Sequence, residues 1–191
     1  MKAVAFNGSP RKRGNTYDMI MKVFEKLEKD SIACEVVQVG GEYIHGCRAC
    51  GACGKNKNNQ CIFRDDLVND ALGKMMDADI IILGSPTYFA ALTPEMKALI
   101  DRCGYVSKAN GGLLNRKIGA SVVPVRRAGA LNVFQAINNF FFINEMIVPG
   151  SSYWNLSIAQ KLGDFTEDAE GVETMNTLGE NISWLLHKIK A

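Results

Sequence analysis

Four of the six cysteines in this chain fall within residues 47–61, and they are its most distinctive chemical feature. Their spacing is Cys-x2-Cys-x2-Cys-x7-Cys. Thiols at two-residue intervals converge on one small inorganic centre only if the loop that carries them turns tightly, and Gly46, Gly51 and Gly54 allow such turns. The candidate ligands are Cys47, Cys50, Cys53 and Cys61.

Three interpretations of this motif are open from the residues alone. Three thiols at two-residue intervals with a remote fourth thiol have the ligand spacing of a 4Fe-4S cluster. Structural zinc more often uses two separated Cys-x2-Cys pairs, and free or redox-active thiols without metal are the third alternative. Disulfides are disfavoured in the cytoplasm, where thiols stay reduced. The spacing favours an iron-sulfur centre.

Other titratable residues have plainer interpretations. His45 has no partner pattern for nucleophilic catalysis, so we assign it no role. The pair Asp65-Asp66 is interpreted as the cap of the next helix rather than as an acid-base pair. Cys34 and Cys103 stand alone, in a strand and near a helix end, and are interpreted as buried, unreactive thiols.

The composition excludes several classes of protein. The chain has 191 residues, a formal net charge of +2, 47% hydrophobic and 22% charged residues, as in ordinary globular proteins. No linker or repeat interrupts it, so we expect one domain over residues 1–191. Balanced charge argues against nucleic acid as a partner, and apolar runs such as 80–83 are too short to span a membrane. The N-terminus is interpreted as a strand rather than a signal peptide, which predicts a cytoplasmic protein.

Short apolar runs alternate with helical patterns along the chain. Strands are expected at residues 2–6, 33–39, 79–84, 117–125 and 146–148. Helices are expected from 15 or 16 onward, from 65 or 66 to 76, from 93 to 103, at 130–143 and at 165–189. This alternation predicts an α/β fold whose open parallel sheet is covered by helices on both faces. Ligands are then expected beyond the carboxyl ends of the strands.

The loop after the first strand has the composition of an anion site. Residues 8–16 combine small residues, hydroxyls and three cations immediately before a helix. Backbone N–H groups and the positive helix terminus would face an anion, and Ser9 and Thr16 add hydroxyl donors. The spacing of the nucleotide-binding P-loop and the Gly-x-Gly-x-x-Gly motif are both absent. The alternative is an exposed polar turn with a helix cap.

The loop after the first strand and the loop after the strand at 79–84 resemble loops of a known family. The run Lys-Ala-Val-Ala-Phe-Asn-Gly-Ser-Pro-Arg at residues 2–11, followed by Gly-Asn-Thr and a helix, is similar to the FMN phosphate loop of the flavodoxin-like NAD(P)H-dependent FMN reductase superfamily. Gly-Ser-Pro-Thr-Tyr at residues 84–88 resembles the second flavin loop of that superfamily.

That resemblance implies positions for ten residues around FMN. The phosphate would be held by Ser9, Arg11, Asn15 and Thr16. The isoalloxazine ring would lie along Pro86, Thr87, Tyr88 and Phe89, with Arg126 and Gly129 of a third loop on its other side. A flavin ring needs a flat wall, which Tyr88 and Phe89 could form. The alternative for this pair is core aromatics at a strand end.

The cysteine motif extends the resemblance to about the whole chain. A Cys-x2-Cys-x2-Cys-x4–7-Cys motif after the second strand of such a fold is characteristic of the iron-sulfur flavoproteins. This implies a flavodoxin-like three-layer sandwich with a five-stranded parallel sheet and a cysteine-rich insertion at about 44–64. It also implies FMN and a 4Fe-4S cluster, brought close across the subunits of a homodimer or homotetramer. The gap before Cys61 lies at the long edge of the family's range.

The expected function is electron transfer between a donor such as ferredoxin and an acceptor, through cluster and FMN. FMN handles one- and two-electron steps, whereas a cluster passes single electrons. The first alternative is an NAD(P)H-dependent FMN or quinone-type reductase that does not require a cluster. The second is a non-enzymatic flavin- or zinc-binding interaction module.

Overall fold

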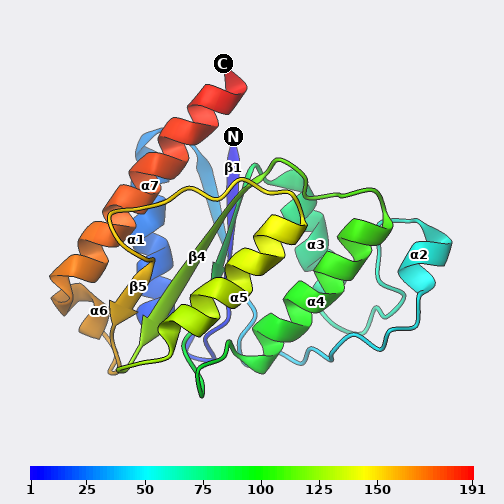
Figure 1. Ribbon diagram of the computed structural model, residues 1–191, viewed down its shortest axis with the longest axis horizontal. Coiled ribbons are helices and arrows are strands. Elements are labelled where there is room, and N and C mark those ends of the chain that lie inside the picture. Colours follow the sequence, from blue (N-terminus) through cyan, green and yellow to red (C-terminus); the bar gives the residue numbers. More distant parts are fainter.

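A parallel sheet lies at the centre of the computed structural model, which describes residues 1–191. Its strand order is β2-β1-β3-β4-β5 (Figure 1). The strands are β1 Lys2–Asn7, β2 Ala33–Gln38, β3 Ile80–Gly84, β4 Ile118–Val125 and β5 Leu156–Ile158. The order changes direction between β1 and β3, so their carboxyl ends are the expected position for a ligand.

Helices cover both faces of the sheet and complete three layers. One face carries α1 Asn15–Lys29 and α7 Ala169–Lys190 (Figure 1). The other face carries α3 Val68–Asp77, α4 Pro94–Ala109 and α5 Ala130–Ile143. Two short helices, α2 Ala52–Asn56 and α6 Asp164–Glu167, lie in the connections. The expected parallel α/β sandwich is confirmed.

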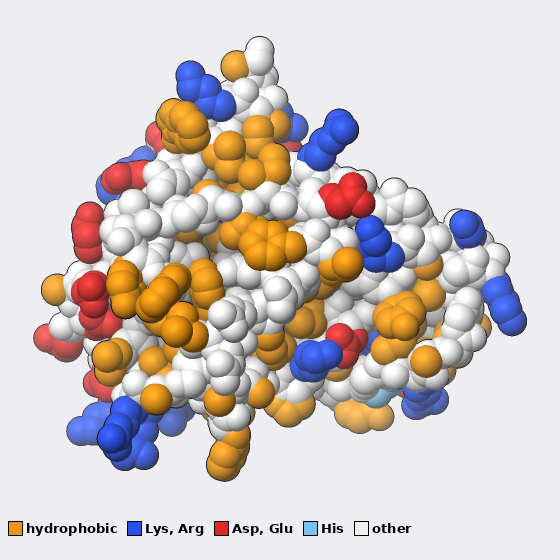
Figure 2. Space-filling model, viewed as in Figure 1, with side chains coloured by type: hydrophobic (Ala, Val, Ile, Leu, Met, Phe, Trp, Pro, Cys, Tyr) orange, Lys and Arg blue, Asp and Glu red, His pale blue; other side chains and the backbone are white.

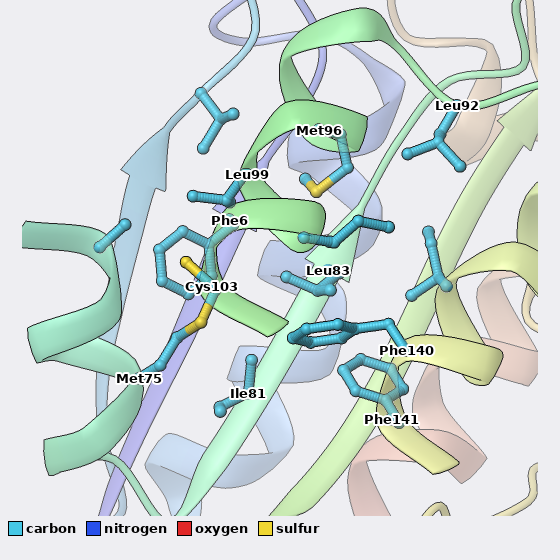
Figure 3. Packing of buried hydrophobic residues seen from close by; sticks show 14 of the residues in the cluster. Phe6, Met75, Ile81, Leu83, Leu92, Met96, Leu99, Cys103, Phe140 and Phe141 are labelled. Atoms are coloured by element: carbon cyan, nitrogen blue, oxygen red, sulfur yellow. The ribbon is translucent and has the colours of Figure 1, made fainter. Parts of the chain in front are cut away.

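Alternating side chains along the central strands divide the core in two. Phe6, Ile81 and Leu83 face α3, α4 and α5, where Figure 3 shows them packed among Met, Leu and Phe side chains. Ala5 and Ile82 face α1 and α7. Because both faces are covered, these strands are apolar throughout, as buried parallel strands usually are.

The fifth strand is not where the sequence predicted it. Residues 146–148 contribute only an isolated bridge, between Ile147 and Ile118 at the start of β4. The chain then leaves the sheet and returns as β5, where Leu156 pairs with Val123 near the end of β4. Both stretches therefore run beside β4, and only the longer pairing qualifies as a strand.

Two helices differ from expectation in length. α4 continues to Ala109 instead of ending near Cys103, because Val106 and Ser107 extend its buried face. The C-terminal helix is divided into α6 and α7 at Asp168, whose carboxylate accepts a hydrogen bond from the Gly171 N–H at 3.0 Å.

The expected N-caps of two helices are wrong by one or two residues. Gly14, rather than Asn15 or Thr16, is the N-cap of α1, and it provides no side-chain cap. Leu67, rather than either preceding aspartate, is the N-cap of α3, although Asp66 accepts a hydrogen bond from the Val68 N–H at 3.2 Å. The side chains of the expected caps are used in other contacts described below.

The cysteine-rich segment lies between β2 and α3, as expected. It contains α2, which the sequence did not predict, and Figure 1 shows this helix projecting beyond α4 at one end of the molecule. Gly51 precedes α2 with φ +70°, a conformation that favours glycine. None of the helices in the structure has the length and apolar character needed to cross a membrane.

Candidate functional site

The loops that follow β1, β3 and β4 meet at the carboxyl edge of the sheet and enclose a cleft. Eight of the ten residues predicted around FMN line it: Ser9, Arg11, Asn15, Thr16, Pro86, Thr87, Tyr88 and Arg126. Ala159 and Gln160, from the loop after β5, complete the wall. Sequence reasoning missed these two because the fifth strand was predicted elsewhere. Figure 2 shows Lys and Arg side chains gathered at the edge where β4 and β5 end.

The loop after β1 is held from behind by polar side chains. The Thr93 hydroxyl donates to the Gly8 carbonyl at 2.9 Å, and Gln38 Nε2 donates to the Ser9 carbonyl at 2.7 Å. Asn7 Oδ1 accepts from the Ser9 N–H at 3.1 Å. The carbonyls of the loop are therefore bonded on the protein side. Because Gly14 provides no side-chain cap, the positive end of α1 is open to an anion.

Two residues of the predicted phosphate site also bind the chain after β5. Arg11 Nη1 donates to the Gln160 carbonyl at 3.1 Å. Asn15 Nδ2 donates to the Lys161 carbonyl at 2.7 Å, and its Oδ1 accepts from the Phe165 N–H at 3.3 Å. Asn15 therefore uses both ends of its amide within the protein while it lines the cleft. Asn15 therefore has a structural role in addition to its predicted contact with the ligand.

The loop after β3 makes a tight turn that separates its two aromatic residues. The backbones of Tyr88 and Ala91 exchange two hydrogen bonds, each 2.9 Å long. Tyr88 lines the cleft, whereas Phe89, at φ +49°, lies fully exposed at the tip of the turn. The alternative of core aromatics is wrong for both residues. A flat wall made by the pair is not seen, and Tyr88 alone faces the cleft.

Gly129 lies next to the cleft rather than in it. It has φ +89°, and a Cβ there would lie 3.0 Å from the Cβ of Ala90. Together with Arg127 it lines a neighbouring cavity of about 440 Å³. The third loop therefore contributes Arg126 to the cleft and the residues after it to the adjoining space.

All four clustered cysteines line a second cavity, beside α4. Cys47 and Cys50 are exposed, Cys53 and Cys61 are half-buried, and all four thiols are free. Apolar side chains form much of the remaining lining, among them Ile62, Phe63, Tyr105 and Val106. The structure thus brings together the complete predicted ligand set in one place.

Amide side chains attach the cysteine loop to the helices beneath it. Asn69 on α3 accepts from the Cys61 N–H at 2.8 Å and donates to the carbonyls of Cys61 and Phe63, each at 3.0 Å. Asn110, at the end of α4, donates to the Cys53 carbonyl at 3.4 Å. The contact of Asn110 connects residues far apart in the sequence, which is why the sequence did not indicate it.

A buried arginine reaches the same cavity from α4. Arg102 is 1% exposed and forms an ion pair with Asp66, whose side chain is fully buried. Its Nη2 donates to Cys61 Sγ at 3.3 Å. Burial alone would lower the pKa of Arg102, but the hydrogen bonds to Asp66 and Cys61 raise it above its ordinary value, so the guanidinium stays charged.

This arrangement gives two residues contacts that the sequence did not indicate. Asp66 is the buried partner of an arginine in addition to its contact at the start of α3. His45, to which no role was assigned, packs edge-on against the Phe63 ring with centroids 4.9 Å apart. Its Nε2 lies 3.8 Å from Asp65 Oδ1. The signal for Arg102 was its position on the apolar face of a helix, one residue before Cys103.

Of the two isolated cysteines, Cys103 is buried as predicted, whereas Cys34 is only half-buried. Cys103 is completely buried, and burial raises the pKa of its thiol to about 12. Burial, with a smaller contribution from Glu28, also raises the pKa of Cys34 to about 12. Both thiols are protonated at neutral pH, so neither is a reactive nucleophile.

The comparisons with known proteins decide the family. The sequence model of the family described as NADPH-dependent FMN reductase matches residues 1–161. The chain is also 32% identical over 197 residues to an iron-sulfur flavoprotein of Methanocaldococcus jannaschii, with all of both chains covered. The chain belongs to the iron-sulfur flavoproteins of the NADPH-dependent FMN reductase family. An iron-sulfur flavoprotein of Methanosarcina thermophila is 30% identical over 192 residues, which cover all of this chain and 97% of that one.

Solved structures show the same fold. RosB with a bound flavin-derived intermediate has a TM-score of 0.75 at 22% identity, and the match covers 100% of this chain and 80% of that one. An archaeal flavodoxin has a TM-score of 0.62 at 17% identity over all of both chains. The expected flavodoxin-like fold is confirmed, and membership of the FMN reductase family makes this iron-sulfur flavoprotein an FMN-dependent oxidoreductase.

Proposed function

We propose that this protein is an electron-transfer flavoprotein that uses FMN in the cleft and a 4Fe-4S cluster in the cysteine loop. The observation that carries the proposal is the convergence of four free thiols on one cavity, in a chain with a separate cleft at the switch point of its sheet. Relatives named iron-sulfur flavoproteins support the pairing.

The cleft has the chemistry that an FMN phosphate requires. Ser9 and Thr16 supply hydroxyls, Arg11 supplies a cation, and the uncapped end of α1 supplies backbone N–H groups. Tyr88 and Arg126 lie farther along the same cleft, where the ring would bind. When bound, FMN supplies both one- and two-electron chemistry. The role of the protein is to neutralise the phosphate and orient the ring.

The cysteine loop has the donors that a 4Fe-4S cluster requires. Cys47, Cys50, Cys53 and Cys61 would be its ligands, and a bound cluster supplies one-electron exchange. Two hydrogen bonds already point to these sulfurs: Ala49 N–H donates to Cys47 Sγ at 3.4 Å, and Arg102 donates to Cys61 Sγ. Such bonds stabilise negative charge on sulfur. Apolar neighbours limit the access of water.

We further propose ferredoxin or NAD(P)H as the electron donor, and a cytoplasmic homodimer or homotetramer as the working form, without nucleic acid or membrane. The second candidate function is an NAD(P)H-dependent FMN or quinone-type reductase with a dispensable cluster. The cavity of about 440 Å³ beside the cleft favours it, since Tyr153 and Leu156 give that space apolar walls suited to a second planar ligand. A flavin- or zinc-binding interaction module has no comparable observation in its favour.

The decisive experiment is purification under anaerobic conditions, followed by iron and sulfide analysis and electron paramagnetic resonance of the reduced protein. We expect about four irons for each chain and the spectrum of a reduced 4Fe-4S cluster. Cys50→Ser should lose the cluster, whereas Cys34→Ser, a thiol outside the cavity, should keep it. One zinc with no iron in such a preparation would make the proposal wrong. Rapid bleaching of the flavin by NADPH alone, with Cys50→Ser unaffected, would favour the second candidate.

A further inference from the structure

Arg102 is the one charged residue that is buried as a whole, and the side chain of its partner Asp66 is buried with it. Arg102 lies on α4 between Leu99 and Cys103, which Figure 3 shows in the hydrophobic core. A buried ion pair is costly to desolvate, and apolar residues of similar size often replace one without loss of stability. Stability alone is therefore a weak reason for this arginine, and its contacts suggest a more specific one.

The guanidinium holds the cysteine loop at both of its ends. It donates to the carbonyl of His45, which precedes the first clustered cysteine, and to the carbonyl of Phe63, which follows the last, each at 3.3 Å. Its other contacts are Asp66 and Cys61 Sγ. One planar group thus joins the two ends of the loop and one of its thiols. A lysine cannot reproduce this fork of donors.

We propose that Arg102 is the positioning residue of the cysteine centre. It closes the base of the loop, holds Cys61 Sγ toward the other three thiols, and places a permanent positive charge beside the site. This inference rests on the proposed function, because it takes Cys61 as a ligand of the cluster. It also explains how a thiol separated by seven residues from its neighbour joins the other three without help from local spacing.

Substitution of Arg102 and substitution of Asp66 are expected to shift the midpoint potential of the cluster in opposite directions. The reduced cluster carries one more negative charge than the oxidised cluster, and a nearby cation or N–H donor favours it. Arg102→Met should therefore shift the midpoint potential of the cluster to more negative values. Asp66→Asn keeps the arginine but removes the facing carboxylate, so it should shift the potential to more positive values. A purely structural role would not produce shifts of opposite sign.

The experiment uses the anaerobically purified protein with both cofactors bound. The potential is measured by titration with dithionite while the resonance spectrum is recorded, and cluster retention is measured as the rate of iron loss to a chelator. Arg102→Met should lose iron at least about tenfold faster. Arg102→Lys should recover much of the potential but little of the retention. Arg64→Met is the matched control, because Arg64 is an exposed cation in the same loop that bonds only to Gln60, and it should match the wild type.

Folding is checked separately, since Arg102→Met leaves the buried Asp66 carboxylate without its cation. The content of bound FMN reports the fold, and the double variant Arg102→Met with Asp66→Asn removes both charges if the single variant does not fold. In the double variant the loss of the bond to Cys61 should still speed iron loss. Equal potentials and equal iron loss in these variants and in Arg64→Met would overturn the role of Arg102.

Failure of the proposed function can be distinguished from failure of the positioning role of Arg102. A wild-type protein without iron, or a Cys61→Ser variant with its cluster intact, would show that the proposed ligand set is wrong. If the wild type binds a cluster, Cys61→Ser abolishes it and Arg102→Met leaves it unchanged, only the positioning role is contradicted.

Discussion

Arg11 shows how a single residue contributes to the flavin cleft. It is exposed, lines the cleft and donates to the Gln160 carbonyl, whereas its neighbour Arg13 is exposed and lies outside the cleft. A phosphate monoester carries nearly two negative charges at neutral pH, and a hydrogen bond between charged groups is stronger than one between neutral groups.

Arg11→Met should weaken FMN binding by about 1.5 kcal/mol, roughly tenfold, because the phosphate loses a charged donor. Quenching of FMN fluorescence on titration with the apoprotein measures the affinity. Arg13→Met removes the same charge from the same loop and should bind FMN as the wild type does. Equal weakening in both variants would mean that Arg11 acts only through the general positive field of the loop.

Site residues were predictable from the sequence where they belong to the loop that directly follows a predicted strand. Ser9, Arg11 and Thr16 follow one strand directly, so their place at its carboxyl end could be inferred. Arg102 and Asn69 act on the cysteine loop from helices that come later in the chain, and only tertiary packing shows this. The exposed position of Phe89 depends on a turn with positive φ at a non-glycine residue, which composition does not indicate.

At the scale of elements, the loop after β1 depends on a close approach by the chain after β2. A Cβ on Gly40 would lie 2.2 Å from the carbonyl carbon of Ser9 and 2.4 Å from the Gly8 oxygen. These neighbours are backbone atoms, so they cannot move aside as a flexible side chain would. The end of β2 therefore supports the phosphate loop directly.

Gly40→Ala should destabilise the protein by about 1–3 kcal/mol, because the added methyl group forces the loop backbone to shift. FMN affinity should fall with it, since Ser9 is displaced. Thermal unfolding with and without FMN measures both effects. Gly73→Ala is the control: nothing lies within 4 Å of a Cβ there, and alanine favours the helix, so stability should be unchanged or higher by up to about 1 kcal/mol. A stable Gly40→Ala protein with normal affinity would contradict this account.

The helices with strong periodicity and the first four strands were predictable, and the edge strand β5 was not. The pattern at 130–143 matches α5 because its apolar face is sealed against the sheet. The stretches 146–148 and 156–158 both lie beside β4, but only the first is a continuous apolar run, and the pairing with β4 makes the second the edge strand. α2 has only five residues, too few for an amphipathic pattern.

At the scale of the whole molecule, both ends of the chain meet at Asp79. Its carboxylate accepts from the Lys2 N–H at 3.0 Å and from Lys190 Nζ at 2.8 Å, and Figure 1 shows the two termini at the same end of the molecule. Burial alone would raise the pKa of Asp79, but these hydrogen bonds and the nearby positive charges lower it below its ordinary value. The contacts therefore favour the ionised carboxylate.

A lowered pKa in the folded state gives stability that is present above the ordinary pKa of an aspartate. That stability is lost as the pH falls through the lower, folded-state value. Asp79→Asn should reduce the free energy of unfolding by about 1 kcal/mol at neutral pH and flatten its decline in acid. Urea unfolding at a series of pH values measures this. Glu42→Gln, at an exposed carboxylate outside the helices, should leave the curve unchanged. An equally steep acid decline in Asp79→Asn would contradict the prediction.

Apart from Arg102, which also contacts Cys61 Sγ, the side chains that hold the cysteine loop form a frame of amides. Asn69 and Asn110 bind carbonyl and N–H groups of the loop, and neither uses a sulfur. Removing whatever the thiols bind therefore takes no hydrogen bond from this frame. In a structural zinc module, by contrast, the metal is what folds the loop. Oxidative loss of the inorganic group here would be damage that can be repaired by refilling the site, without the need to fold the chain again.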